Sequence, residues 1–361
     1  MAGFGREDQR RAGGRRRYRG AVVNGIGRVD AFQRRHRVVG YPIAVVYKYF
    51  DDQGPYLAAI IAYYSFIAIF PILLISTSVL GFLLQGDPGL SDRLLDTALS
   101  QFPIVGDQLG RPEGLTGSTG AIVVGSLAAL YGALGLGQST QNAANIAWSV
   151  PRNSRANPFL MRLKSLILLA TAGVGILVIA VGSSVLANAQ SINETFSDEI
   201  NLALRIVGFV LSVGIFWALF RLVSAGRGRW PYLLAGAAVT AGLWQLLQWA
   251  GQAYVSNVIN TASSMNGTFA LVLGLIAFIY VAALMVVVGL EVAVVSSRRL
   301  FPRALLTPFT DNVVLTEADQ RAYTAYAKSQ RHKGFQVVEV RFDEVDAPTE
   351  VIARDDQPPS A

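Results

Sequence analysis

The residues of this 361-residue chain most able to do chemistry are the few ionisable side chains inside strongly apolar stretches. Glu291 lies near the C-terminal end of the apolar stretch 268–295. Arg221 occupies the corresponding depth in the stretch 202–223. A charge inside a bilayer is costly unless it is paired, so we predict a structural ion pair between Glu291 and Arg221. Arg205 stands at the opposite depth and cannot reach Glu291. The alternatives for Glu291 are a carboxylate that couples proton or substrate movement, or one that reaches water and neutralises the arginines that follow it.

Side-chain amides gather at the end of another apolar stretch, residues 118–148. Amides there can hydrogen-bond neighbouring helices near the membrane interface, which is the interpretation we favour, or they can line a cavity. Under the second interpretation they belong to a substrate pathway together with Pro71, Arg205 and Glu291. The amides concerned are Gln138, Gln141, Asn142 and Asn145.

Nothing in the sequence predicts catalysis. The histidines, His36 and His332, lie in charged segments with no acidic or histidine companion at ligand spacing. No phosphate-binding loop, nucleophile elbow or HExxH motif is present. Cysteine is absent, so a disulfide framework and a thiolate metal site are excluded. We therefore expect no enzyme activity, no catalytic residue, no bound metal and no cofactor.

The stretch with the amides also carries a stripe of small residues at steps of three and four. On an α-helix such steps stay on one face, which leaves a groove along the helix. Close backbone approach across a groove of this kind is what holds membrane helices together. We therefore predict that Gly125, Gly132 and Gly135 pack against a neighbouring helix. The full stripe is Ser118, Ala121, Gly125, Ala128, Gly132, Gly135, Ser139 and Asn142.

Composition predicts an all-α, polytopic membrane protein. Hydrophobic residues make up 52% of the chain and charged residues 15%, and the mean hydropathy is +0.40. Pro71 should kink the first span because it removes a backbone hydrogen bond in mid-helix. Six stretches are long and apolar enough to cross a bilayer, at about residues 55–84, 118–148, 165–187, 202–223, 232–255 and 268–295.

The distribution of basic residues sets the orientation of the six predicted spans. Lys and Arg are concentrated in alternate loops, so the positive-inside rule places both termini in the cytoplasm. Residues 1–37 form a basic cytoplasmic arm, and residues 38–303 form the transmembrane domain. Two amphipathic helices are expected at the interfaces, at 38–50 on the inner side and 92–109 on the outer side.

The tail, residues 304–361, is expected to be cytoplasmic. Thr316 and Asp319 have the spacing of a capping pair, which predicts a helix over 317–332. Residues 338–342 alternate like a short strand, which needs a partner strand or stays unformed. From Asp346 onward the composition is typical of disorder.

Four sequence blocks together resemble a known family. They are AYYSFIAIFPIL at 62–73, ALYGALGLGQSTQNAANIAW at 129–148, GAAVTAGLWQLLQWAGQAYV at 236–255, and NGTFALVLGLIAFIYVAALMVVVGLEV at 266–292. In this order they are similar to the YihY/BrkB family of bacterial inner-membrane proteins, in its YhjD-like branch. The family's terminal Gly-x-Glu is matched by Gly289 and Glu291. Its basic residue after the Trp of the second block is replaced by Ser149, so a ligand held there would differ.

The resemblance implies six transmembrane helices and a role in the cell envelope, described as transport and linked to lipid traffic. The function expected from it is movement of a lipid-like or other amphiphilic envelope component. The alternative is a non-transporting membrane scaffold that docks envelope or cytoplasmic partners. Expected partners are membrane lipids and, beyond them, a second copy of the chain or an envelope protein. No specific nucleic acid is expected, because the basic arm lacks an aromatic-interleaved motif.

Overall fold

The structure is a computed structural model, and it describes residues 29–83, 119–190, 197–259, 264–310 and 313–342. The contacts divide the chain into two compact units. The helical unit is Lys48–Arg298, and the terminal unit combines Met1–Tyr47 with Arg299–Ala361. All regular secondary structure in the described ranges is helical. The predicted all-α fold class is confirmed for that part of the chain.

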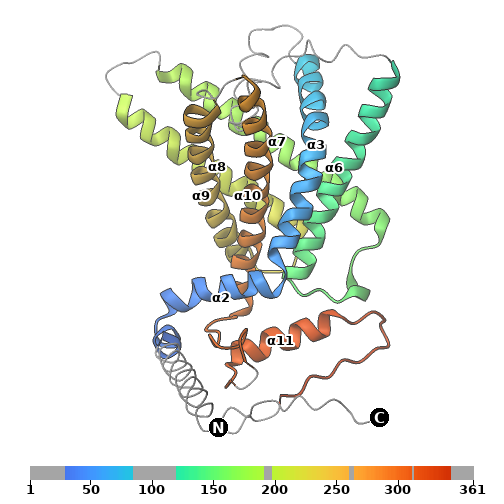
Figure 1. The fold of residues 1–361 in the computed structure, drawn as a ribbon, viewed down its shortest axis with the longest axis vertical. Helices are drawn as coiled ribbons and strands as arrows, with labels where there is room; N and C mark the ends of the chain where they lie inside the picture. Colours follow the sequence, from blue (N-terminus) through green and yellow to red (C-terminus); the bar gives the residue numbers. More distant parts are fainter. Residues whose placement is uncertain (1–28, 84–118, 191–196, 260–263, 311–312, 343–361) are drawn as a thin grey trace, which may run out of the picture. The chain divides into compact units, whose positions relative to one another are not determined.

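The described residues of the helical unit form six long helices. Three of them have a proline in the first turn, where the missing N–H would have no helical partner: Pro55, Pro158 and Pro231. A π-helical turn, η4 (Val255–Ile259), extends the fifth helix. The helices are α3 (Gly54–Leu83), α6 (Thr119–Ala147), α7 (Pro158–Gln190), α8 (Ser197–Val223), α9 (Trp230–Tyr254) and α10 (Ser264–Arg298) (Figure 1).

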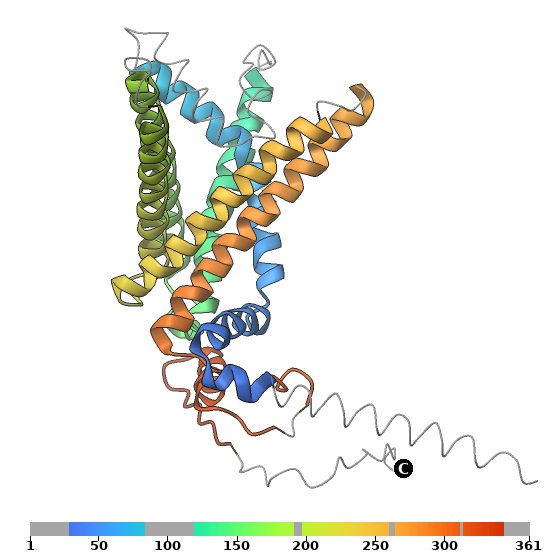
Figure 2. The same ribbon diagram turned by 90° about the vertical axis from the view of Figure 1, so that its left-hand side faces the viewer.

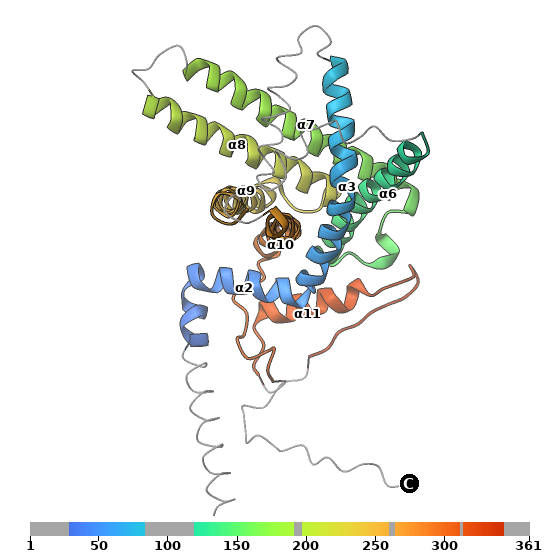
Figure 3. The same ribbon diagram turned by 45° about the horizontal axis from the view of Figure 1, so that its top comes forward.

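These six helices form a closed ring in chain order. Each helix packs against the next one along the chain, and α10 closes the ring by packing against α3. Figure 3 shows α7 and α8 running side by side, and Figure 2 shows the same for α9 and α10. Consecutive membrane helices joined by short loops are expected to pack as neighbours. The arrangement places one face of every helix toward a common interior.

The described residues include four helical stretches that are long and apolar enough to cross a membrane, and a shorter apolar one at Gly54–Ala68. Their apolar side chains face outward over much of their length, as expected for contact with lipid. A membrane protein built from apolar helices is therefore supported, while the count of six spans stays a prediction. The four stretches are Pro158–Ile179, Arg205–Val223, Trp230–Ile259 and Phe269–Arg298.

Two glycines of the predicted packing stripe lie directly against α3. A Cβ atom built on Gly135 would lie 2.1 Å from Cδ1 of Tyr64, and one on Gly132 would lie 2.6 Å from Cγ2 of Ile67. No side chain fits in either place, so both glycines allow the close approach of α6 to α3. Gly125 belongs to α6 but lies outside the residues whose surroundings are described.

The terminal unit joins the start of α2 (Arg37–Asp51) and the residues before it to the segment that follows α10. Gln33 donates a side-chain hydrogen bond to the carbonyl oxygen of Arg303. Asp30 accepts one from the amide of Leu305 at 3.0 Å, and the Tyr47 hydroxyl donates to the Leu305 carbonyl at 2.6 Å. Residues 38–47 and 299–303, assigned above to the transmembrane domain, belong by their contacts to this unit.

The predicted tail helix is present as α11 (Glu317–Ser329). Thr316 and Asp319 form a capping box at its start, as their spacing predicts. The Asp319 carboxylate also pairs with the guanidinium of Arg303, and both side chains are fully buried. The Arg303 guanidinium lies over the ring of Tyr323, 5.4 Å from its centroid. The helix therefore carries its own anchor within the terminal unit.

The remaining expectations about the terminal segments concern residues 338–342 and segments that lie outside the described residues. Residues 338–342 have no regular secondary structure, so of the two alternatives given above the segment stays unformed. A lone strand without a partner has no hydrogen-bonded ladder to stabilise it. The basic arm before residue 29, the outer helix at 92–109 and the tail from Asp346 lie outside the described residues.

Candidate functional site

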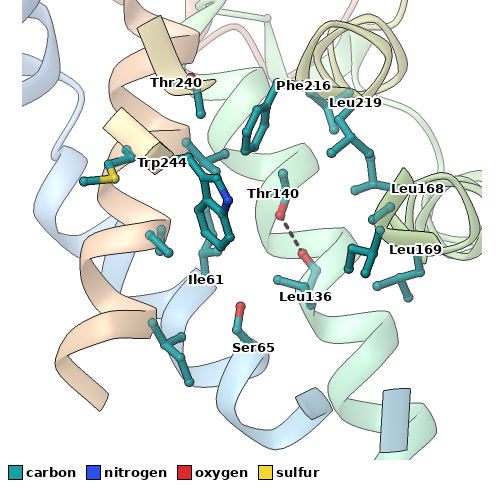
Figure 4. A pocket seen from close by; sticks show the side chains of 18 of the residues that line it. Ile61, Ser65, Leu136, Thr140, Leu168, Leu169, Phe216, Leu219, Thr240 and Trp244 are labelled. Carbon is teal, nitrogen blue, oxygen red and sulfur yellow. Dashed lines mark hydrogen bonds between the residues drawn. The ribbon is translucent and has the colours of Figure 1, made fainter. Parts of the chain in front are cut away.

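A cavity of about 320 Å³ lies inside the ring of six helices. All six helices contribute to its wall, so the cavity follows from the closed ring (Figure 4). Its size falls at the lower end of the range of roughly 300–1,000 Å³ that is typical of small-molecule sites. The wall is almost wholly aliphatic and aromatic, and includes Ile61, Leu136, Leu168, Leu169, Ile176, Phe216, Leu219, Trp244, Phe278 and Ile279.

The polar groups on this wall are few, and two of them are already bonded. The Thr140 hydroxyl donates to the Leu136 carbonyl at 2.8 Å, drawn as a dashed line in Figure 4. The Thr240 hydroxyl donates to the Gly236 carbonyl at 3.0 Å. A hydroxyl that donates to a carbonyl of its own helix has little hydrogen-bonding capacity left for a bound molecule. The cavity is therefore suited to an apolar chain and poorly suited to an ion or a sugar.

Trp244 of α9 shapes the cavity. Its ring meets Phe216 of α8 edge-on, with 6.4 Å between centroids, and Phe278 of α10 at 6.0 Å. Edge-to-face contacts in this distance range hold aromatic rings in fixed orientations. Trp244 thus lies between two other wall residues, and Figure 4 shows it projecting into the space between the helices.

The amides predicted for a substrate pathway lie away from this cavity, on the packing surfaces of α6. Gln141 donates to the Met161 carbonyl at 2.9 Å and to the Ser165 hydroxyl at 3.0 Å, which ties α6 to α7. Asn142 accepts a hydrogen bond from Arg155 at 3.2 Å. Burial, and after it the charge of Arg152, lowers the pKa of Arg155. These contacts favour the interpretation in which the amides hold helices together.

The remaining pathway candidates are scattered. Gln138 is half-buried and Asn145 is buried, and neither lines the cavity. Arg205 is exposed near the start of α8. α3 continues through Pro71, whose side chain lies outside the described residues, so the predicted kink stays a prediction. The structure does not bring these residues together around one site.

The structure gives Glu291 a different charged partner from the one predicted. Its Oε2 atom lies 3.4 Å from Nζ of Lys48 at the end of α2, and both side chains are buried. Arg221, the predicted partner, is exposed on α8. The prediction of Arg221 rests on depth in the membrane, and depth does not say which way a side chain points around its helix. Glu291 faces the interior of the unit and Arg221 does not.

Lys48 also pairs with Asp52, which precedes α3, and donates to the Ala147 carbonyl of α6 at 3.0 Å. Burial raises the pKa of Asp52, while the Lys48 ammonium acts in the opposite direction. We call Lys48, Asp52 and Glu291 the buried charge cluster. A sequence signal for it existed, because Lys48 and Asp52 are four residues apart and so share one helical face.

Comparison with known proteins places the chain in a family. The Virulence factor BrkB family matches residues 45–310. UPF0761 membrane proteins from two strains of Vibrio cholerae serotype O1 are 32% identical over 107 residues, which are 30% of this chain and 36% of theirs. The chain thus matches little more than a third of the length of these relatives. No solved structure matches it significantly. Because the family match covers most of the chain, from the end of α2 through α10, this membrane protein belongs to the Virulence factor BrkB family.

Proposed function

We propose that the protein binds a lipid-like or other amphiphilic envelope component and moves it across the inner membrane. The observation that carries the proposal is the apolar cavity of about 320 Å³ that is lined by all six helices of the ring. Transfer of a hydrocarbon chain from water to an apolar wall is favourable. The hydroxyls of Thr140 and Thr240 already donate to carbonyls of their own helices, so they do not need a hydrogen-bond partner from the bound chain. The polar part of the amphiphile would then remain outside the apolar wall.

The alternative function, a scaffold that only docks partners, needs no cavity among its helices. A closed ring of membrane helices that merely held a partner would be expected to fill its interior with side chains, as protein cores do. The cavity therefore favours the transport proposal over the scaffold.

The same proposal includes six spans, with both termini in the cytoplasm. The 30 residues of α3 and the 29 residues of α6 exceed the roughly 20 needed to cross a bilayer. Reporter fusions at Gly106, Asn193 and Asn260 should report the outer side. Fusions at Asn153, Gly228 and Thr307 should report the cytoplasm. A cytoplasmic signal from Asn193 would remove this topology.

A glycine on the cavity wall allows a direct test of binding. Gly173 of α7 lines the cavity and a Cβ atom there would meet nothing within 4 Å, so Gly173→Leu adds apolar bulk to the cavity wall with open space at its first side-chain atom. Leucine also favours the helix over glycine. Gly208 of α8 is equally open and lies away from the cavity, which makes Gly208→Leu the matched control.

The measurement uses purified protein in vesicles that contain a phospholipid with a fluorescent group on one acyl chain. A membrane-impermeant reductant destroys the fluorescence on the outer leaflet, so its further decay reports movement between leaflets. We expect movement with the unmodified protein and with Gly208→Leu, and a several-fold loss with Gly173→Leu. Equal rates with protein-free vesicles would reject lipid transport, and equal rates for the two variants would reject the cavity as its route.

A further inference from the structure

The buried charge cluster contains two carboxyl groups and one ammonium group. Lys48 pairs with both carboxylates, Asp52 and Glu291. The side chain of Glu291 is fully inaccessible, and those of Lys48 and Asp52 are 1% and 2% exposed. If both carboxyl groups were ionised, the three side chains would carry one uncompensated negative charge away from water. Proteins avoid such a charge by binding a proton instead.

The hydrogen bonds identify the carboxyl group that takes the proton. Asp52 accepts from the Lys48 ammonium. Both carboxyl oxygens of Glu291 are buried and have no hydrogen-bond partner of normal geometry in the described residues, with the Lys48 ammonium 3.4 Å from Oε2. A carboxylate without hydrogen bonds is poorly stabilised, whereas a protonated Glu291 would gain a donor. Asp52 is placed to accept a hydrogen bond from that donor.

The elements around Glu291 offer few other groups to compensate its charge. The titratable groups that act on it, within the described residues, are Lys48 from α2 and Asp52 from the turn before α3. Asp51 adds a further negative charge beside Asp52, which disfavours the ionised form of Asp52. The α6 end contributes the Ala147 carbonyl, which Lys48 already uses. Further along α10 itself, Arg298 donates to the Trp148 carbonyl.

The residues that pack against α10 two residues before Glu291 are uncharged. α9 presents Gly236 and Thr240 to α10 at Gly289, two residues before Glu291, and α8 presents Phe220 there. The Thr240 hydroxyl donates to the Gly236 carbonyl. None of these three residues carries a charge that could offset a second carboxylate.

We propose that the Lys48–Asp52–Glu291 cluster is a proton-binding site, which holds one proton on Glu291 at neutral pH and passes it toward Asp52 through a hydrogen bond. With the proton on Glu291, the charged groups of the cluster are the Lys48 ammonium and the Asp52 carboxylate, so the net charge of the cluster is zero. This proposal goes beyond lipid movement and does not depend on it.

The position of the site connects it to the cavity. Glu291, Val287 and Ala283 follow one another at steps of four along α10, and therefore share one face of that helix. Val287 and Ala283 belong to a buried cluster with Ile61 of α3. Ala283 and Ile61 both line the cavity. A change of charge at Glu291 thus acts on the same helix face that forms the cavity wall.

Infrared spectroscopy of the unmodified protein in nanodiscs tests the proposal at neutral pH. A protonated carboxyl group has a C=O stretching band separate from the carboxylate bands. We expect one such band per molecule, and we expect it to shift when the protein is made with carboxyl-¹³C glutamate but not with carboxyl-¹³C aspartate. Absence of the band, or a shift with labelled aspartate instead, would overturn the assignment. The labelled proteins need no substitution, so folding cannot confuse this result.

Two substitutions sharpen the test. Glu291→Gln should abolish the band because the proton site is gone. Asp52→Asn should abolish it too, because Glu291 would then be the single carboxylate beside Lys48 and would ionise. A solitary protonated glutamate would keep its band in Asp52→Asn, and that outcome would reject the shared site. Glu317, whose side chain is 90% exposed, supplies the control Glu317→Gln, which should leave the band unchanged.

Discussion

Nζ of Lys48 and Oε2 of Glu291 lie 3.4 Å apart, although one residue begins the helical unit and the other lies in the last turns of α10. Their pairing joins the first and last helical segments of the unit at a point where neither side chain reaches solvent. Asp52 shares the same ammonium, so the energetic consequences of changing each residue differ.

Lys48→Met should destabilise the protein far more than Glu291→Gln. The first change leaves two carboxyl groups buried without a cation, and loss of one partner from a buried pair costs about 3–5 kcal/mol. The second leaves Lys48 neutralised by Asp52. The free energy of unfolding, measured in mixed detergent micelles, should also show a coupling between the two changes on the order of 0.5–3 kcal/mol.

The control for this cycle is Arg221→Gln combined with Glu291→Gln. Arg221 is exposed, so these two changes should add. A coupling between Arg221 and Glu291 as large as that between Lys48 and Glu291 would contradict the contacts described here.

Local patterns in the sequence predicted local structure well, and long-range partners poorly. The capping pair Thr316 and Asp319 could be predicted because three residues of spacing determine its geometry. The partner of Glu291 could not, because apolar spans give depth but not rotation about the helix axis. Lys48 also belongs to the segment 38–50, which is expected at the interface, so the depth of residues within the apolar spans does not point to it. The cavity depends on six helices closing into a ring, and the sequence of any one helix does not contain that information.

Gly135→Leu should lower the free energy of unfolding by about 1–3 kcal/mol or more, because overpacking forces α6 away from α3. The ring of Tyr64 occupies the space that any side chain at this position would need. Gly214→Leu on α8 is the matched control, since a Cβ atom there meets nothing within 4 Å. Thermal unfolding in detergent measures both. Similar melting temperatures for the two variants would mean that α6 and α3 are not closely packed in the protein.

Asp319→Asn should loosen the terminal unit by several kcal/mol, because it leaves the buried Arg303 guanidinium without its carboxylate. Thr316→Ala removes the capping hydroxyl alone and should cost about 0.5–2 kcal/mol. Hydrogen exchange of the α11 amides should therefore be fastest in Asp319→Asn and intermediate in Thr316→Ala. Glu317→Gln, at an exposed position, should leave the exchange rates nearly unchanged. Faster exchange in Thr316→Ala than in Asp319→Asn would contradict a buried pair.

Stability at alkaline pH should depend on Tyr49. Burial, and after it the nearby Tyr280, raises the pKa of Tyr49 to about 12. An unfolded tyrosine has a pKa of about 10, so the stability linked to its neutral form is complete below pH 10 and is lost as pH rises through about 12. Tyr49→Phe should therefore reduce the fall in unfolding free energy over that interval. Tyr56→Phe, at an exposed position, should retain it. An unchanged profile in Tyr49→Phe would show that another group is responsible.

Two neighbouring glycines separate backbone strain from packing at the loop between α8 and α9. Gly226 and Gly228 both have positive φ, at 80° and 85°, so a substitution to alanine strains the backbone at either position. That strain costs roughly 1–2 kcal/mol for a residue with a Cβ atom. At Gly226 the new methyl group would meet nothing within 4 Å, whereas at Gly228 it would lie 2.5 Å from Cη2 of Trp148.

Trp148 cannot move aside without loss, because its indole donates to the Ser224 hydroxyl at 2.9 Å and its carbonyl accepts from Arg298. Gly228→Ala should therefore lower the free energy of unfolding by more than Gly226→Ala does, and the excess measures the contact with the indole ring. Replacing Trp148 with Phe in the Gly228→Ala background should recover part of that excess, because the smaller ring vacates the position of Cη2. In the Gly226→Ala background, replacing Trp148 with Phe should recover nothing and should only lower the free energy of unfolding by its own separate cost. Equal effects of the two glycine substitutions would place Trp148 elsewhere.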